Sequence, residues 1–327
     1  MIYEDKVYGK VEITEPVVLS LINSKAFQRL KGIDQGGYSK PFFPFYFTRY
    51  EHSLGVYLLL KKYDVSLQEQ IAGLIHDVSH SCFSHCIDYA LAEDSGEMQD
   101  HQDKVFKEFV LKTEIPLILK KHKLNIDYIL NEENFPLKEK EIPDLCADRI
   151  DYSLRTAIEA GLVKKDWVLK YFKKLKVINN NWVFEDVENA RNFAQLFLKL
   201  NREFYAGLNS AVMFSTAGDW LAYGLLKGYI DYQDLYTTDK FVVQKISKYI
   251  KADKKLTRLW WRLNNKVDIR NNPKNYDKKV AVKSRIVDPL FLNSKKEIIR
   301  FSQIEVDWRL IVKKELRPKK YYLKFDY

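Results

Sequence analysis

The segment GLIHDVSHSCFSH, residues 73–85, places three histidines and an aspartate among apolar and small side chains. The whole chain has only 6 histidines, so half of them lie in this short segment. An apolar interior tolerates such polar groups only when each one is hydrogen-bonded or bound to a metal. The segment therefore predicts either a metal site or a set of polar side chains that are incidental to a buried helix.

The rest of the chain is typical of a mainly helical globular protein. Hydrophobic residues make up 46% of the 327 residues, whereas only 12 residues are Gly and 9 are Pro, so turn-forming residues are scarce. Helical spacing of apolar residues predicts helices in five segments. These segments are residues 16–33, 49–63, 66–83, 143–161 and 187–230.

Short β structure is expected as an addition to these helices. Residues 5–14 alternate weakly and predict a strand or a hairpin, and residues 177–186 predict a hairpin around three asparagines. Toward the C-terminus the pattern loosens, with a helix expected near 239–262 and strands near 280–287 and 303–325. The predicted fold class is therefore mainly α, with small β-hairpin additions and a mixed C-terminal region.

Positive charge is concentrated near the C-terminus. Residues 251–327 contain 22 Lys or Arg and 9 Asp or Glu, a net charge of +13, whereas the whole chain has a net charge of +10. A basic region of this kind can contact nucleic acid, a nucleotide or an acidic partner. Its aromatic residues, such as Trp260, Trp261, Tyr321 and Tyr322, could stack on bases. The favoured interpretation is a solvated surface, because apolar residues are interleaved throughout.

The cysteines and the N-terminus indicate a cytoplasmic protein. Cys82, Cys86 and Cys146 are too few, and odd in number, for a disulfide framework. Cys82 and Cys86 could be metal ligands, but small buried residues are the favoured interpretation. The first residues are charged where a signal peptide needs an apolar run, and no stretch approaches the roughly 18 apolar residues of a membrane span. We expect no contact with a membrane.

The candidate metal ligands are His52, His76, Asp77 and Asp148. On a helix His76 and Asp77 project about 100° apart, yet both can lean toward one ion beside the helix. One helix cannot complete a coordination sphere, so His52 on an earlier predicted helix and Asp148 on a later one are expected to join them. Two imidazoles and two carboxylates leave positions for water, as in a catalytic site. They suit one divalent transition metal, Fe, Mn, Zn or Ni, better than Mg.

The order of these residues, H…HD…D, resembles the HD-domain metal-dependent phosphohydrolases. Four segments extend the resemblance to the dNTP triphosphohydrolase branch of that family: FQRLKGIDQGG, RYEHSLGVYLL, HDVSHSCFSH and DRIDYSLR. The resemblance covers roughly residues 3–230. It implies an HD phosphohydrolase domain at 1–235, followed by a basic C-terminal region at 236–327 that serves oligomerisation, effector binding or nucleic-acid contact.

The resemblance also implies a role for the residues around the metal. His80 and His101 would handle protons near the scissile phosphate. Eight residues would contact the substrate: Gln35, Arg49, His85, Arg149, Tyr152, Thr156, Arg202 and Tyr205. Asp151 is expected to lie behind the ligands or on the helix surface.

The chemistry of the resembled branch is the hydrolysis of a dNTP to deoxynucleoside and triphosphate. A divalent metal lowers the pKa of bound water toward ~7 and polarises a phosphoryl oxygen. Arginines offset the charge that builds on the other oxygens, and a histidine can protonate the leaving oxygen.

Two positions depart from the family pattern and leave sugar selection open. Thr156 stands where these enzymes often have an aspartate, and Gly36 replaces a larger apolar residue that presses on the 2′ position. A glycine there would admit a ribose 2′-hydroxyl. The histidine and lysine usual near Arg202 and Tyr205 are also absent.

Three functions stay open on the sequence. The favoured one is a dNTP triphosphohydrolase, and the second is a phosphohydrolase on another nucleotide or on a nucleoside monophosphate. The third is a nucleic-acid-binding protein or nuclease that uses the basic C-terminal region. We expect a nucleotide substrate and a homo-oligomer, with an effector nucleotide or nucleic acid at residues 236–327.

Overall fold

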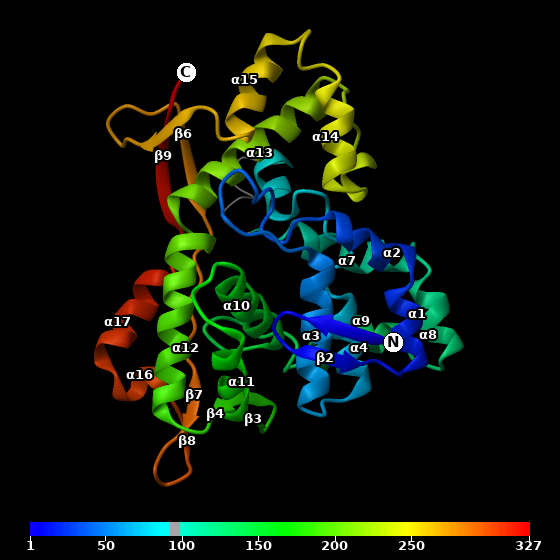
Figure 1. The fold of residues 1–327 in the computed structure, drawn as a ribbon, viewed down its shortest axis with the longest axis vertical. Helices are drawn as coiled ribbons and strands as arrows, with labels where there is room; N and C mark the ends of the chain where they lie inside the picture. Colours follow the sequence, from blue (N-terminus) through cyan, green and yellow to red (C-terminus); the bar gives the residue numbers. More distant parts are fainter. Residues whose placement is uncertain (92–98) are drawn as a thin grey trace.

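Helices predominate in the computed structural model, which describes residues 1–91 and 99–327. Three small sheets lie among them in this part of the chain. The mainly helical fold with small β additions is thereby confirmed. In Figure 1 the N-terminus lies at the right of the molecule and the C-terminus at its upper left. Among the same residues, no helix is both long and apolar enough to cross a membrane.

The N-terminal part is a hairpin followed by a group of helices. β1 (Ile2–Asp5) pairs antiparallel with β2 (Gly9–Glu12), so the hairpin predicted for this region is confirmed. The helices and 3-10 turns that follow are α1 (Pro16–Ile22), α2 (Lys25–Gln28), η1 (Arg29–Gly32), α3 (Arg49–Lys62), α4 (Leu67–Ile75), η2 (Ser84–Ile87), α5 (Asp88–Leu91), α7 (His101–Leu111), α8 (Ile115–Lys121), α9 (Ile126–Leu130) and η3 (Glu132–Asn134).

The middle part contains the second predicted hairpin and α13, the longest helix of the described residues, with 19 residues. Its elements are α10 (Ala147–Glu159), α11 (Lys165–Lys173), β3 (Leu175–Ile178), β4 (Asn181–Phe184), α12 (Val187–Leu200), the π-helical turn η4 (Asn201–Tyr205) and α13 (Leu208–Leu226). β3 and β4 pair antiparallel around Asn179 and Asn180, whose φ angles are 50° and 56°. Positive φ at both positions is what a tight two-residue hairpin turn requires, and asparagine tolerates it.

The C-terminal part is mixed, as predicted, but its elements differ in detail. They are η5 (Asp234–Tyr236), α14 (Asp239–Ser247), α15 (Lys254–Leu263), β5 (Asp268–Asn271), β6 (Lys278–Val282), β7 (Leu290–Leu292), β8 (Ile298–Arg300), α16 (Phe301–Ile304), α17 (Val306–Glu315) and β9 (Lys319–Asp326). The strand predicted at 303–325 is wrong over most of its length. Trp308 and Val312, four residues apart, bury one face of α17 beside Phe301, which is a helical pattern.

The basic C-terminal region shares its core with the rest of the chain. β7 pairs parallel with β4, and β8 extends the same sheet. β9 lies between β5 and β6 in a separate sheet, and Val282 and Leu323 of that sheet are buried in one apolar cluster with Trp220 of α13 and Leu256 of α15. In Figure 1, α16 and α17 flank α12 on its outer side. The boundary between residues 235 and 236 stays a prediction, but the two parts are packed together.

The helices α3 and α10 approach each other closely at Gly55, where side chains of α10 fill the space of an absent Cβ. An ideal Cβ on Gly55 would lie 2.0 Å from Asp151 Oδ1 and 2.2 Å from Arg155 Nη2. Both side chains are fixed, because Arg155 donates to Asp151 at 3.0 and 3.1 Å and to Asp5 Oδ2 at 3.1 Å, all in the interior. Gly55 thus allows α10 to lie against the helix that carries His52.

Gly55→Ala should therefore destabilise the protein by about 3 kcal/mol, because a methyl group cannot enter without breaking a buried ion pair. Gly73→Ala is the matched control. Its Cβ would meet the flexible end of Leu60 at 2.6 Å and Val56 at 3.0 Å, so we expect a loss of about 1 kcal/mol. Urea unfolding of both variants measures the difference. If the two variants had the same free energy of unfolding, the close approach of α10 to α3 at Gly55 would be contradicted.

Candidate metal centre

A cavity of about 370 Å³ opens among the segments that contain the predicted site residues. Eleven of those residues line it: Gln35, Arg49, His76, Asp77, His80, His85, Asp148, Arg149, Tyr152, Thr156 and Tyr205. His52 is fully buried and lies directly behind Asp148, to which it is hydrogen-bonded. His101 and Arg202 are not among the lining residues.

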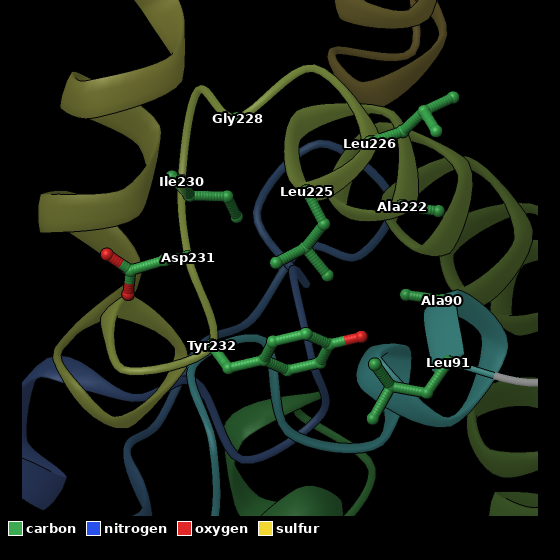
Figure 2. Close-up of a pocket in the computed structure, with 9 residues that line it drawn as sticks. All are labelled: Ala90, Leu91, Ala222, Leu225, Leu226, Gly228, Ile230, Asp231 and Tyr232. Atoms are coloured by element: carbon green, nitrogen blue, oxygen red, sulfur yellow. The ribbon is translucent and has the colours of Figure 1, made fainter.

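A second cavity, of about 470 Å³, lies beside α5 and the segment that follows α13 (Figure 2). Its walls are mostly apolar, with Leu225, Ile230 and Tyr232 turned toward its centre. Asp231 is the one carboxylate among its described lining residues, and no histidine lines it. Among the residues that the structure describes, it shares no lining residue with the first cavity and offers no set of metal ligands.

The HD segment forms a turn where the sequence predicted a continuing helix. α4 ends at Ile75, and His76 is its C-cap, so Asp77 and His80 lie beyond the helix. Arg29 holds the turn that follows, because its Nη2 donates to the backbone oxygens of Val78 and His80, at 2.7 Å each. These carbonyl groups are thus satisfied outside a helix.

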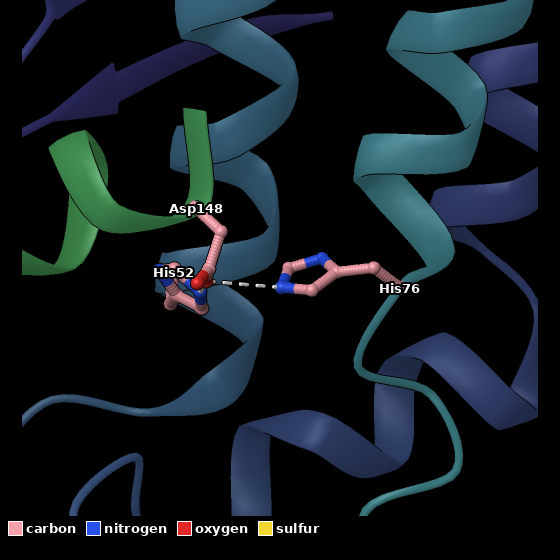
Figure 3. A group of neighbouring side chains, drawn as sticks. All are labelled: His52, His76 and Asp148. Atoms are coloured by element: carbon pink, nitrogen blue, oxygen red, sulfur yellow. Dashed lines mark hydrogen bonds and ion pairs between the residues drawn. The ribbon is translucent and has the colours of Figure 1, made fainter. Parts of the chain in front are cut away.

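The candidate metal ligands His52, His76 and Asp148 converge from three elements (Figure 3). His52 comes from α3, His76 from the end of α4, and Asp148 from the first turn of α10. One ligand atom of each lies within 4.8 Å of the others. Asp148 Oδ1 is 2.8 Å from His52 Nε2 and 3.5 Å from His76 Nε2. α10 begins at Ala147, four residues later than the predicted start at Pro143.

The orientation of His76 fits a bound cation. Its Nδ1 lies 2.7 Å from the Gly73 oxygen, which can only accept, so Nδ1 is the donor and Nε2 is free to ligate. Nε2 is buried and has no hydrogen-bond partner among the described residues. It instead faces the carboxylates of Asp77 and Asp148, at 3.3 and 3.5 Å. A cation is the group that satisfies a nitrogen lone pair and two carboxylates together.

The electrostatics of His52 favour positive charge at the same place. Burial by itself lowers the pKa of this imidazole, but the hydrogen bonds to Asp148 and Asp151 outweigh burial and raise the pKa to about 9. Asp151 accepts from His52 Nδ1 at 2.8 Å and is fully buried, so it lies behind the ligand as expected. A carboxylate in this position orients the ligating ring and makes it more basic.

Asp77 is shared between the metal ligands and Arg49. Its Oδ2 accepts from Arg49 Nη1 at 2.6 Å, and its Oδ1 lies 3.4 Å from His80 Nε2. Arg49 also donates to Ser84 Oγ at 2.7 Å. Its guanidinium holds the pKa of the buried Asp77 carboxyl below the ordinary value, against the effect of burial. Asp77 therefore presents one oxygen toward the metal site, and its role as a ligand stays a prediction.

His80 and His85 lie face to edge in the cavity wall, with ring centroids 5.1 Å apart. Burial, and then the charge of Arg49, lower the pKa of His80 well below its ordinary value. Burial also lowers the pKa of His85, and the nearby carboxylate of Asp88 only partly offsets it. Both imidazoles are thus neutral near pH 7, a form that can accept a proton or donate one N–H.

The structure does not bring His101 and Arg202 to this cavity. His101 begins α7, and its Nε2 lies 3.2 Å from the Tyr236 hydroxyl. Arg202 donates to Glu315 at 2.8 and 2.9 Å, and its side chain is half-exposed. Their proposed roles stay predictions. The proximity of Arg202 to Glu315 was not readable from the sequence, because the two residues are far apart along the chain.

The other predicted substrate contacts lie beside the metal ligands. Arg149 is held by Glu139 Oε1 at 3.1 Å and by the Asp144 backbone oxygen at 3.0 Å. Tyr152 packs edge-to-face on Tyr205, with centroids 5.3 Å apart. The cavity also has an aromatic wall, in which Phe45 packs edge-to-face on Phe204.

Besides His76 Nε2, three polar atoms of the predicted substrate contacts lack partners in the described part of the chain. The Oε1 of Gln35 and the hydroxyls of Tyr152 and Tyr205 are buried and have no hydrogen-bond partner among the described residues. Buried polar atoms without partners are rare and are frequently binding groups. Thr156 lines the same cavity.

Sequence reasoning missed several charged residues of the cavity wall. They are Asp103, Glu132, Lys138, Glu139, Lys140, Glu141, Lys283 and Arg285. Most come from irregular segments, whose path no local pattern predicts. The excess of basic residues near the C-terminus was a signal for Lys283 and Arg285, but it could not single them out.

Asp151→Asn should weaken the binding of a divalent metal by about 10- to 100-fold, because the amide no longer fixes and polarises the His52 ring. The change also removes a partner of Arg155 and should lower stability. Asp5→Asn is the matched control, since Asp5 is the other carboxylate on Arg155 and does not touch His52. Calorimetric titration with Mn²⁺ should show weakened binding only for Asp151→Asn. Equal affinities in the two variants would contradict this role.

The chain matches one family model and several known proteins. The family model described as "HD domain" matches residues 49–156, which include all four candidate ligands. YdhJ, an uncharacterized protein of Bacillus subtilis, is 33% identical over 298 residues, 89% of this chain and 89% of its own. The metal-dependent phosphohydrolase cns2 of Cordyceps militaris is 34% identical over 230 residues, 67% of this chain and 64% of its own.

More distant matches concern part of the chain or the fold alone. The mouse deoxynucleoside triphosphate triphosphohydrolase SAMHD1 is 31% identical over 144 residues, 38% of this chain and 22% of its own. A solved structure of a hypothetical protein from Aquifex aeolicus has a TM-score of 0.72 at 22% identity, covering 100% of this chain and 96% of its own. Together with the ligand cluster, the long match to YdhJ and the matched HD domain establish that this chain belongs to the HD-domain metal-dependent phosphohydrolases.

Proposed function

We propose that the protein hydrolyses the phosphate ester of a nucleotide, and that its preferred reaction converts a dNTP and water to deoxynucleoside and triphosphate. One observation supports this most: a single cavity joins the cation site to arginines and to an aromatic wall. A nucleotide would fit such a cavity, with its phosphate groups at the cation site and the arginines and its base against the aromatic wall. The partial identity to SAMHD1 favours the deoxynucleotide version.

The phosphate would lie between the metal ligands and the two arginines. A divalent cation at His52, His76 and Asp148 supplies Lewis-acid polarisation of a phosphoryl oxygen and activation of water. Arg149, oriented by Glu139, would stabilise charge that builds on the other phosphoryl oxygens. Arg49 would do the same, although each arginine is partly neutralised by its own carboxylate, Asp77 for Arg49 and Glu139 for Arg149.

Proton transfer falls to the neutral imidazole of His80. The lowered pKa of His80 leaves the imidazole unprotonated at neutral pH, so a ring nitrogen is available to accept a proton from the attacking water, although the same shift makes it a weaker base. The imidazolium formed in this way would be repelled by the nearby charges of Arg49 and the bound cation. It would therefore pass its proton on rapidly. Balanced hydrolysis adds the hydroxyl to phosphorus and the proton to the leaving sugar oxygen.

The nucleoside would occupy the part of the cavity lined by aromatic residues. Gln35 and Tyr152 offer unpaired polar atoms that would bond to the sugar hydroxyl groups. Phe45 and Phe204 offer flat apolar surface to a base. At Gly36 an added Cβ would lie 2.5 Å from Ser39 Oγ and 3.6 Å from Asp34 Oδ1, so a larger side chain fits there only if Ser39 moves.

A phosphohydrolase on a nucleoside monophosphate is the second candidate. The observation that favours it is the number of carboxylates in the wall, Asp103, Glu132, Glu139 and Glu141, which would repel a long phosphate chain. The relative cns2, which is described only as a metal-dependent phosphohydrolase, also matches more of the chain than SAMHD1 does.

A hydrolysis panel of dNTPs, NTPs and nucleoside monophosphates, each with Mn²⁺, Fe²⁺, Co²⁺, Ni²⁺, Zn²⁺ or Mg²⁺, tests the proposal. We expect deoxynucleoside and triphosphate as products with a transition metal, and loss of at least about 100-fold in Asp148→Asn because a ligand is removed. Asp166→Asn is the matched control, since Asp166 is exposed on α11.

The products separate the two candidates. Orthophosphate released from monophosphates, with triphosphates left intact, would replace the first candidate by the second. Activity that survives in Asp148→Asn, or after removal of metal with a chelator, would contradict both.

A further inference from the structure

Lys283 and Arg285 bring the basic C-terminal region into the cavity of the metal ligands. They lie in the extended segment between β6 and β7, and both line the cavity beside Arg149 and His85. The resemblance to known phosphohydrolases covers roughly residues 3–230, so it assigns nothing to this segment. The two side chains are half-buried, whereas Ser284 between them is 3% exposed. Neighbouring residues of an extended chain point to opposite sides, so Lys283 and Arg285 face the same way.

The backbone of this segment is fixed from its inner side. Asn201 Oδ1 accepts from the Arg285 backbone N–H at 3.0 Å, and Asn201 Nδ2 donates to Ser284 Oγ at 3.0 Å. Asn201 Nδ2 also donates to Glu315 Oε2 at 3.2 Å. Asn201, Ser284 and Glu315 are all buried. The positions of the two cations are therefore built into the fold.

The Arg285 side chain is also oriented. Its Nη2 donates to Gln99 Oε1 at 3.0 Å, and Gln99 Nε2 in turn donates to the Tyr89 hydroxyl at 3.3 Å. Tyr89 donates to the backbone oxygen of Ala281 at 2.9 Å, which closes the chain of bonds on β6. Gln99 is a neutral amide, so this bond positions the guanidinium without cancelling its charge.

The charge of Arg285 acts on the cavity. The pKa of Lys283 is lowered by burial first and by Arg285 second, while Asp103 opposes both. Arg285 also contributes, after burial and nearer groups, to the lowered pKa of His85. Two cations held side by side in a half-buried wall repel each other, and an anion placed between them removes that cost.

We propose that Lys283 and Arg285 bind the phosphate groups of the substrate that lie farthest from the metal, so that the C-terminal region selects the length of the phosphate chain. This inference rests on the proposed nucleotide phosphohydrolase activity and adds its specificity residues. It also assigns a function to two of the basic residues of the C-terminal region, Lys283 and Arg285. Arg285 should contribute more to phosphate binding than Lys283, because the carboxylates of Asp103 and Asp100 partly offset the charge of Lys283.

Steady-state kinetics on the mono-, di- and triphosphate of one nucleoside test this assignment. Arg285→Gln should raise KM for the triphosphate about 10- to 100-fold, the loss expected for charge-assisted hydrogen bonds to phosphate. KM for the monophosphate should change less than about 3-fold, and Arg285→Lys should restore part of the affinity. Lys279→Gln is the matched control, because Lys279 is exposed on β6. Equal changes of KM for all three substrates, or none, would overturn the proposal.

A binding measurement separates this proposal from the proposed activity. Inorganic tripolyphosphate and orthophosphate are titrated calorimetrically into the Mn²⁺-loaded protein, with no hydrolysis involved. The wild type should bind tripolyphosphate more tightly, and Arg285→Gln should lose that preference while Lys279→Gln keeps it. If no nucleotide is hydrolysed yet this pattern holds, the anion site stands and the proposed activity fails. If triphosphates are hydrolysed and Arg285→Gln binds tripolyphosphate like the wild type, the anion site fails alone.

Discussion

His52 and Arg155 share one buried carboxylate, Asp151, and the metal centre depends on that arrangement. Hydrogen bonds run without interruption from Asp148 through His52, Asp151 and Arg155 to Asp5. Charges in the interior are tolerated only when each has its partner, so removing one leaves the next uncompensated. The position of a metal ligand on α3 is therefore coupled to the hairpin at the N-terminus, although that hairpin lies outside the cavity.

Two local features allow this network to form around a cation. Gly55 lets α10 lie close against α3, which places Asp148 beside His52. Arg29 takes up two carbonyl oxygens after α4, which lets the chain turn at His76 and present its Nε2 to the same point. The resulting ligand cluster comes from the beginnings of α3 and α10 and from the end of α4. The side chains that hold it in place, Asp151 and Arg155, are not themselves among the candidate ligands.

The sequence predicted the residue types of the site better than the backbone that carries them. The grouping of His52, His76 and Asp148 followed from their chemistry, because a lone helix cannot complete a coordination sphere. The helix expected through His76 was wrong, and the turn found there is held by Arg29, a residue distant in the sequence that no local pattern links to it. The strand expected at 303–325 failed because helical burial of α17 depends on packing against Phe301 and Ile286, which no local pattern contains.

A count of charges says how many cations a region has but not where they point. The net charge of +13 over residues 251–327 suggested a surface for nucleic acid, or a solvated one. Lys283 and Arg285 belong to that count, yet they line the cavity with the metal ligands. Their direction is set by Ser284, whose burial beside Asn201 turns both neighbours the other way. Successive side chains of an extended chain point to opposite sides, so the burial of the Ser284 hydroxyl directs Lys283 and Arg285 toward the cavity.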